Sequence, residues 1–240
     1  TPLRYCGGNI RHDHPEVALD KIFVFDTETT GLLDFKKPAD DPAQPRLASL
    51  AIIKADLVYD TWQIVSETRT LVRPDGWVMP PDVAEKVHGL TQEVLERDGG
   101  PVGDALNLFE EAVNEGRVAV AHNAQYDAKL LRGENRRAGR DDLFERTPNI
   151  CTMRAATAVC RIPSPRGRGF KFPKLAEAYR HLLGKDMAMA HDSLADARAA
   201  FEVFCALHKL GALPPAVVHY AADRLAQDRE KLPIGTGESA

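Results

Sequence analysis

Four acidic residues and one histidine stand in three short polar segments of this chain, each beside an apolar run or an amphipathic helix. The segments are Asp26-Thr27-Glu28-Thr29-Thr30-Gly31, His122-Asn123-Ala124-Gln125-Tyr126-Asp127 and His191-Asp192-Ser193-Leu194-Ala195-Asp196. Carboxylates that converge repel one another, so a cluster of them is typical of a site for divalent cations. An imidazole beside such cations can accept a proton near neutral pH. These residue types indicate metal-dependent phosphoryl chemistry.

The first acidic pair stands at the end of an expected strand. Asp26 and Glu28 are two residues apart, so on extended backbone both side chains leave the same face. They follow the apolar run 21–25, and open α/β sheets bind ligands at the carboxyl ends of their strands. Taken alone, an acidic pair of this spacing also occurs by chance in solvated loops, which is the alternative interpretation.

The other two acidic residues belong to expected helices. Asp127 falls in the first turn of a helix expected over 124–137, where the helix dipole by itself favours an acidic side chain. Asp196 lies near the apolar face of the last core helix and is expected to be partly buried. A buried carboxylate requires a partner, and either an arginine or a metal would serve.

The histidine precedes the start of that last helix. Asp192 or Ser193 is the expected N-cap, so the ring of His191 can project over the mouth of the site while Asp196 lies about one turn deeper. This placement suits a base above a metal. An ordinary surface histidine is the alternative, and the same alternative applies to His88 and His122.

Apolar periodicity indicates which elements position these residues. Strands are expected at 21–25, 47–53, 61–72, 118–121 and 149–152. The first three form an antiparallel meander with a polar turn around Asp56 and Asp60, and the later two alternate with helices, so right-handed crossovers place them parallel to the first. Helices are expected before His88, after Thr91, and near 102–113, 124–137, 153–159, 175–183, 192–210 and 214–231. The predicted fold class is α/β, a mixed five-stranded sheet flanked by helices.

Composition narrows the class of protein. Of 240 residues, 44% are hydrophobic, enough for a real core, and the formal net charge of -4 provides no general attraction for nucleic acid. Any polyanionic substrate would therefore meet local cations and bound metal. The four scattered cysteines have no zinc-ligand spacing, no membrane span is expected, and the chain start lacks a signal-peptide pattern. A cytoplasmic protein without a membrane partner is expected.

The three motifs, in this order, resemble those of the DnaQ-like, or DEDDh, 3'-5' exonucleases. Two shorter segments extend the resemblance, which covers roughly residues 20 to 210: Val87-His88-Gly89-Leu90-Thr91 and Pro173-Lys174-Leu175-Ala176-Glu177. The resemblance implies a ribonuclease H-like fold. It also implies that the enzyme removes nucleoside 5'-monophosphates from the 3' end of DNA or RNA. The expected organisation is an N-terminal extension over 1–20, an exonuclease domain over 21–211, and a C-terminal helix and tail over 212–240.

The resemblance also implies roles for individual residues. Two divalent cations, Mg²⁺ or Mn²⁺, would be held by four carboxylates: Asp26, which bridges them, Glu28, Asp127 and Asp196. His191 would act as the general base. The pocket for the terminal nucleotide would be lined by Thr29, His88, His122 and Asn123.

Three classes of function remain open. The chain could be a free-standing exonuclease, a proofreading subunit that acts with a DNA polymerase, or an inactive nucleic-acid-binding module. The complete carboxylate set argues against the third, because binding a polyanion does not require four converging negative charges. A glutamine-led apolar motif of the kind that binds a polymerase or clamp is not found in 213–240, which favours the first class.

Two features bear on the substrate. The acidic, proline-rich insert 32–46 is longer than the link expected at this position, and its aspartates would repel a duplex unless they are folded away. Single-stranded nucleic acid is therefore the favoured partner. The basic stretches 132–140 and 161–174 are candidates for phosphate contacts, and solvated protein surface is the alternative for both.

Overall fold

The computed structural model describes residues 17–82, 84–187 and 192–218. A five-stranded sheet of order β3-β2-β1-β4-β5 forms its centre. The strands are β1 (Lys21–Thr29), β2 (Leu47–Val58), β3 (Thr61–Leu71), β4 (Val118–Ala121) and β5 (Asn149–Cys151). β1 pairs antiparallel with β2 and β2 with β3, whereas β4 runs parallel to β1 and β5 parallel to β4. The predicted meander followed by parallel strands is confirmed.

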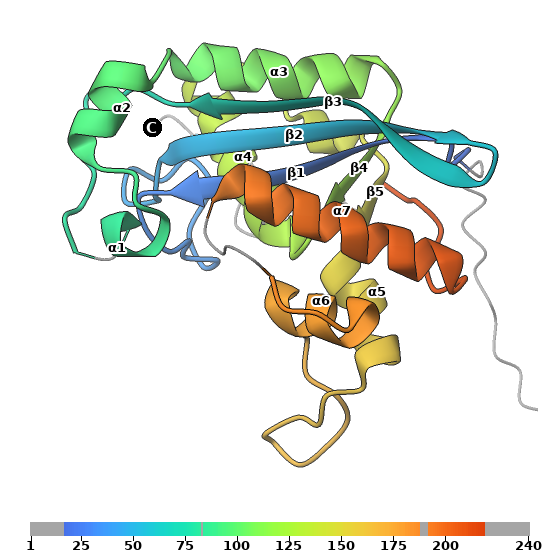
Figure 1. The fold of residues 1–240 in the computed structure, drawn as a ribbon. Helices are drawn as coiled ribbons and strands as arrows, with labels where there is room; N and C mark the ends of the chain where they lie inside the picture. The colour runs from blue at the N-terminus through green and yellow to red at the C-terminus, as the bar shows by residue number, and fades with distance from the viewer. Residues whose placement is uncertain (1–16, 83, 188–191, 219–240) are drawn as a thin grey trace, which may run out of the picture.

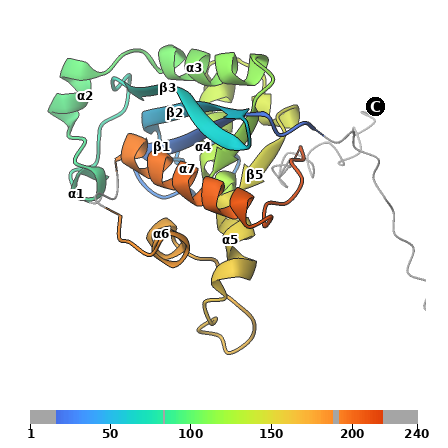
Figure 2. The ribbon, with the colours of Figure 1, turned by 45° about the vertical axis from the view of Figure 1, so that its right-hand side comes forward.

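Helices cover both faces of this sheet (Figures 1 and 2). They are α1 (Ala84–His88), α2 (Gln92–Asp98), α3 (Val102–Asn114), α4 (Ala124–Arg137), α5 (Thr152–Cys160), α6 (Leu175–Leu183) and α7 (Ser193–Lys209), with a 3₁₀ turn η1 (Leu143–Glu145) before β5. The odd-numbered side chains of β1, such as Phe23, pack with Phe109 of α3 in one core cluster. The even-numbered ones, such as Val24, pack with Phe204 of α7 in another.

The β2–β3 hairpin extends further than the apolar pattern predicted. Tyr59 and Asp60 both have positive φ, 47° and 62°, and connect the two strands directly. Two such residues are typical of the tight hairpin turn whose twist matches that of the strands. The turn is therefore confined to these two residues, and Asp56 remains within β2.

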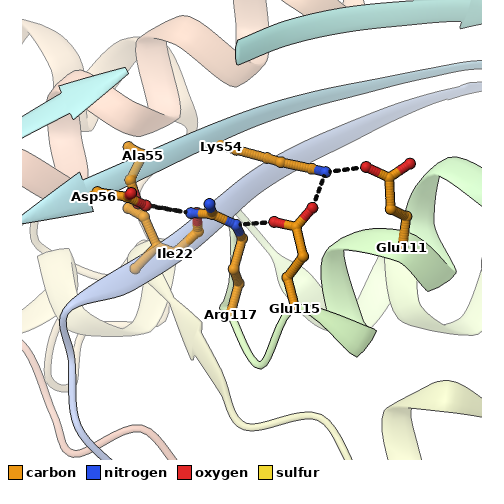
Figure 3. Close-up of polar contacts among 7 residues, drawn as sticks. All are labelled: Ile22, Lys54, Ala55, Asp56, Glu111, Glu115 and Arg117. Atoms are coloured by element: carbon orange, nitrogen blue, oxygen red, sulfur yellow. Dashed lines mark hydrogen bonds and ion pairs between the residues drawn. The ribbon is translucent and has the colours of Figure 1, made fainter. Parts of the chain in front are cut away.

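An ion network braces the start of β1 and β4, at the opposite end of the sheet from the acidic pair (Figure 3). Lys54 Nζ of β2 lies 2.6 Å from a carboxylate oxygen of both Glu111 and Glu115 of α3. Arg117 donates to Glu115 and, at 2.6 Å, to Asp56. Both cations are largely buried, so these partners compensate charges that would otherwise be costly.

The segment after α7 differs from the prediction. A helix was expected from 214 onward, but the described part, 214–218, is extended, and Val217 accepts a hydrogen bond of 2.8 Å from the backbone N–H of Asn149. The residue before a proline is disfavoured in the helical region, so Pro214 and Pro215 keep residues 213 and 214 out of a helix. The rest of the predicted helix, and residues 1–16 of the predicted N-terminal extension, lie outside the described residues. In the described ranges, no helix has the length and apolar character needed to cross a membrane.

Candidate active site

The alternation of β1 places its acidic pair on one face of the sheet. Ile22 and Val24 pack toward α7, so Asp26 and Glu28, in the same alternation, project on the α7 side, while Thr27 points toward α4. The last residue of β1 paired with β4 is Val24. The two carboxylates therefore extend beyond the parallel pairing, at the carboxyl end of the strand.

Three carboxylates meet at this position. One ligand oxygen from each of Asp26, Glu28 and Asp196 lies within 4.8 Å of the other two. The first two come from β1 and the third from the first turn of α7, which crosses the same face. Oxygen donors at such distances fit a hard divalent cation such as Mg²⁺ or Mn²⁺.

Asp127 is held differently. Its Oδ1 accepts hydrogen bonds from Thr27 Oγ1, at 2.7 Å, and from the Thr27 backbone N–H, at 3.2 Å. Asp127 therefore approaches β1 from α4. Its partner Thr27 stands between Asp26 and Glu28 in the sequence, but the Thr27 side chain lies on the other face of the sheet. It is not part of the close group of three, although its charge acts on both Asp26 and Glu28.

The environment opposes negative charge on this cluster. Burial, reinforced by Asp127 and Asp196, raises the pKa of Asp26 well above its ordinary value. Burial, followed by the charges of Asp196 and Asp127, raises the pKa of Glu28 to about 8. Burial raises the pKa of Asp127 to about 7 although the Thr27 hydrogen bonds favour its ionised form. A bound divalent cation would compensate this repulsion, so the donor set fits such a group.

Three contacts fix the start of α7, and with it Asp196. The N-cap is Asp192, which is one of the two residues predicted for this position. Its Oδ1 accepts hydrogen bonds from the backbone N–H groups of Leu194 and Ala195 at 3.1 and 3.0 Å. Its other oxygen contacts the guanidinium of Arg69 on β3. Ser193 forms a buried hydroxyl–hydroxyl hydrogen bond of 2.7 Å with Ser49 of β2.

The strand register explains why these partners are available. Asp26 of β1 lies opposite Ala51 of β2, and Ala51 lies opposite Arg69 of β3, so the three side chains form one row on the α7 face. The small side chain of Ala51 leaves space between the carboxylate and the guanidinium. Sequence analysis singled out neither Arg69 nor the serine pair, because only strand pairing brings them to the site.

His191 lies outside the described residues. The structure describes the chain again from Asp192, the neighbouring residue, whose capping contacts are those given above. Its role as a base stays a prediction.

His88 connects the α1–α2 segment to the end of β1. Its Nε2 donates to the carbonyl oxygen of Thr29 at 3.1 Å, and its Nδ1 accepts from the Leu90 backbone N–H at 3.2 Å. The first contact assigns the proton to Nε2, because a carbonyl can only accept. The ring thus holds the backbone of Thr29 in place, beside the acidic pair.

His122 is similarly engaged by the fold. Its Nε2 donates to the carbonyl oxygen of Pro173 at 3.0 Å, and its Nδ1 lies 3.0 Å from Thr152 Oγ1. Burial lowers the pKa of His122 to about 4, so the neutral ring accepts from the Thr152 hydroxyl. The ring connects the end of β4 to the start of α5 and to the segment before α6.

The remaining predicted pocket residues lie around the start of α4. Asn123 is its N-cap and has a left-handed backbone, φ 71° and ψ 43°, which asparagine tolerates better than most residues. Thr29 Oγ1 lies 3.3 Å from the hydroxyl of Tyr126, which also donates to the Gly31 carbonyl oxygen at 2.9 Å. Tyr126 thereby ties α4 to the segment following β1.

Two exposed apolar side chains beside this segment were missed by sequence analysis. Leu32 is 87% exposed, and Phe35 is half exposed with its ring centroid 6.4 Å from that of Tyr126. Their position in the sequence, shortly after Thr29-Thr30-Gly31, could have indicated a role at the site, since apolar side chains exposed beside a polar site can contact a ligand.

The insert 32–46 is folded against α4. Glu134 accepts two hydrogen bonds from the Arg46 guanidinium, at 2.8 and 3.0 Å, and one from the Leu47 backbone N–H. Gln44 is buried and bonds the backbone of Asp34 in both directions. The insert is a shaped loop, and its Asp40 pairs with Arg136 of α4 at 3.7 Å.

The first basic stretch serves the same packing. Arg132 pairs with Asp142, Arg137 with Glu134 and with the carbonyl oxygen of Asp41, and Arg140 with Asn107 and Glu110. These arginines neutralise neighbouring carboxylates, and Arg137 also holds the insert. The contacts of 132–140 support the alternative interpretation, that this stretch is protein surface without a phosphate role. The stretch 161–174 is then the basic stretch available to a substrate.

Comparisons with known proteins agree with this arrangement. A family model described as Exonuclease (RNase_T) matches residues 23–204. The DNA polymerase III subunit epsilon of Treponema pallidum is 28% identical over 191 residues, which are 80% of this chain and 76% of the relative. The range matched by the family model includes all three motifs.

Solved structures share the fold. The nuclease domain of 3'hExo, a DEDDh family member bound to rAMP, has a TM-score of 0.61 at 14% identity and matches 83% of this chain and 98% of that one. Escherichia coli exonuclease I in complex with a dA16 oligonucleotide has a TM-score of 0.60 at 16% identity over 79% of this chain. The match spans only 41% of the exonuclease I chain. The architecture is therefore the ribonuclease H-like fold expected from the motifs.

Proposed function

Because the chain belongs to the exonuclease family, in its DnaQ-like branch, we propose that it is a metal-dependent 3'-5' exonuclease that releases nucleoside 5'-monophosphates one at a time. The observation that carries the proposal is the convergence of Asp26, Glu28 and Asp196 within 4.8 Å. Such a group is costly unless it holds a cation, and the pKa values of Asp26 and Glu28 are raised accordingly.

Four carboxylates would hold the metal: Asp26, Glu28, Asp127 and Asp196. A pair of divalent ions, Mg²⁺ or Mn²⁺, would there supply an activated water and stabilise the leaving oxygen of an in-line displacement. Asp26 would be the ligand shared by both ions, since it is the carboxylate whose pKa is raised by the charges of all three others. Thr27 positions Asp127 through its two hydrogen bonds and thus sets the reach of α4 toward the site.

His191 is the proposed general base. The next residue in the chain, Asp192, caps α7 and contacts Arg69, so the described chain begins again at a fixed point directly after His191. An imidazole there would accept the proton of the attacking water, with a reference pKa of about 6.5 that suits neutral pH.

The terminal nucleotide would occupy the surface around Thr29 and Asn123. We propose that His88 and His122 shape this pocket through their hydrogen bonds to Thr29 and Pro173. Tyr126 and the exposed Leu32 complete it, the latter as an apolar contact for the base.

A proofreading role in a complex with a DNA polymerase is the second candidate. It is favoured by the 28% identity to a DNA polymerase III epsilon subunit over most of both chains. Nucleic acid is the partner in either case. An inactive binding module remains disfavoured, because all four carboxylates are present and three of them converge.

Product sizing tests the proposal. With Mg²⁺, a 5'-labelled linear single strand should shorten by one nucleotide at a time, and EDTA should abolish the reaction. A 3'-phosphorylated strand and a circular strand should both resist, because a pocket built for a 3'-hydroxyl has no cation for a further dianion. Cleavage of the circle, or undiminished activity in EDTA, would overturn the proposal. Stimulation by an added polymerase would favour the second candidate.

A further inference from the structure

A basic and aromatic loop projects from the body of the molecule between α5 and α6 (Figures 1 and 2). We define the basic loop as residues 161–174. It contains five cationic residues and no acidic one, Arg161, Arg166, Arg168, Lys171 and Lys174, in a chain of net charge -4. This local excess of positive charge contrasts with the rest of the protein.

The loop has a defined shape. The backbone N–H of Lys171 donates to Ile162 at 2.9 Å, and that of Ser164 donates to Gly169 at 3.0 Å, so the two sides of the loop are paired. Gly167 and Gly169 have φ of 75° and 67° and form its tip. Glu177 of α6 anchors the base through Lys171 Nζ, at 2.5 Å, and the Lys174 backbone N–H.

Its charged and aromatic side chains are available to a ligand. Within the part of the chain that the structure describes, neither Arg166 nor Arg168 has an acidic partner, in contrast to the arginines of 132–140. Phe170 and Phe172 are 51% and 56% exposed. About half of each ring is open to solvent, and large exposed rings beside guanidinium groups are typical of surfaces that bind single-stranded nucleic acid.

The base of this loop contacts two elements that carry the candidate active site. The guanidinium of Arg154 of α5 lies 5.9 Å from the centre of the Phe172 ring and donates to Gln125 of α4 at 3.4 Å. Gln125 lies in the first turn of α4, two residues after Asn123 of the proposed nucleotide pocket. On the other side, Pro173 accepts the hydrogen bond of His122, at the end of β4. The loop base therefore borders the proposed nucleotide pocket, and the tip extends away from it.

We propose that the basic loop binds the single-stranded part of the substrate upstream of its 3' end. This inference rests on the proposed function, which places the 3' end at the carboxylates. Arg166 and Arg168 would contact phosphates, and Phe170 and Phe172 would stack on bases. Stacking requires unpaired bases, so the loop selects a substrate whose last several nucleotides are single-stranded over a blunt duplex.

Two variants of the full chain test the loop by independent chemistry. The first is Arg166→Glu with Arg168→Glu, and the second is Phe170→Ala with Phe172→Ala. The matched control is Lys21→Glu with Lys209→Glu, which changes the net charge by the same amount as the arginine variant. These residues lie at the start of β1 and the end of α7, away from the carboxylates. All are assayed on a 20-nucleotide single strand and on the p-nitrophenyl ester of thymidine 5'-monophosphate, which has no upstream nucleotides.

Each loop variant should lose about tenfold or more in kcat/KM on the single strand, mainly through KM, and keep the wild-type rate on the ester. The arginine variant should also show a shallower dependence on salt concentration. The lysine control should match the wild type on both substrates. Unchanged kcat/KM of both loop variants on the strand would overturn the inference, as would an equal loss on a blunt duplex. A wild type inactive on both substrates would instead overturn the proposed function.

Discussion

At the scale of single residues, the four carboxylates occupy different environments. Asp26 and Glu28 are adjacent on one face of β1, Asp196 joins them from α7, and Asp127 is bound by Thr27. Their substitution should therefore have different consequences, and removal of a ligand should be separable from removal of the base.

Asp26→Ala should abolish hydrolysis without unfolding the protein. The substitution removes the proposed bridging ligand, and it also removes a charge that Asp127 and Asp196 oppose. The thermal midpoint without metal should be equal to or above that of the wild type, and the rise produced by Mn²⁺ should disappear. Asp20→Ala, an exposed carboxylate before β1, is the control and should behave as the wild type. Residual Mn²⁺ stabilisation in Asp26→Ala would contradict the ligand assignment.

His191→Ala should reduce kcat by ~10² to 10⁴, the usual contribution of a positioned base, with little change in metal affinity. The measurements are single-turnover rates and a Mn²⁺ titration monitored by thermal shift. His181→Ala, on the exposed side of α6, is the matched control. If His191→Ala and Asp26→Ala lost metal affinity equally, His191 would be a ligand and not a base.

At the scale of elements, the site depends on how α7 and α4 are attached to the sheet. Two ion pairs connect α7 to β3. Arg69 pairs with Asp192 at the helix start, and Arg198 pairs with Glu67 further along the helix. α4 is connected to the insert 32–46 through Glu134 and Gly133. These attachments permit tests with internal controls.

Arg69→Ala should reduce kcat about tenfold, because the first turn of α7 positions both Asp196 and His191, and small misplacements of reacting groups are costly. Arg198→Ala removes an ion pair between the same two elements but away from the site, and it should change kcat less than about twofold. Steady-state kinetics of the two variants provide the comparison. Equal effects would mean that the position of the helix start is unimportant for the reaction.

Gly133→Ala should destabilise the protein although alanine is the better helix former. A Cβ at this position of α4 would lie 2.3 Å from the carbonyl oxygen of Ala39 in the insert. The clash would displace the insert, and the free energy of unfolding should fall by about 1 to 3 kcal/mol. In the control, Gly103→Ala on α3, the Cβ would meet only the Arg140 side chain at 3.6 Å, so a gain of up to about 1 kcal/mol is expected. Denaturant titrations of both variants measure the difference.

At the scale of the whole molecule, the buried carboxylates couple stability to pH and to metal. Glu28 and Asp127 have pKa values of about 8 and about 7 in the folded protein, above their ordinary values of 4.5 and 3.8. Between the ordinary and the raised values, the folded state therefore binds more protons than the unfolded state. The metal-free protein should lose stability as the pH rises through this window.

A bound divalent cation should counteract that loss. In EDTA, the thermal midpoint should fall between pH 5.5 and pH 8.5, and saturating Mn²⁺ should raise it more at the higher pH, where the carboxylates are ionised. Asp26→Ala should show a weaker pH dependence in EDTA and no metal effect. A Mn²⁺ shift of the same size at both pH values would contradict the coupling.

The local pattern of the sequence was sufficient for most elements. β4 at 118–121, α4 at 124–137 and α6 at 175–183 agree with their predicted ranges, since each combines a strong apolar pattern with clear boundaries. The period of two on β1 likewise predicted that Asp26 and Glu28 share a face, because alternation is a property of the strand itself. By contrast, the helix expected from 214 was wrong where it is described.

Only the tertiary structure decided which residues hold the site together. Arg69 and Ser49 reach α7 through strand register, and register depends on pairing between segments far apart in the chain. The same holds for Thr27, whose side chain faces away from the acidic pair and so binds Asp127 from α4. Short-range spacing determines the face on which a side chain lies. Its partner across the sheet is determined by long-range packing, which no local pattern encodes.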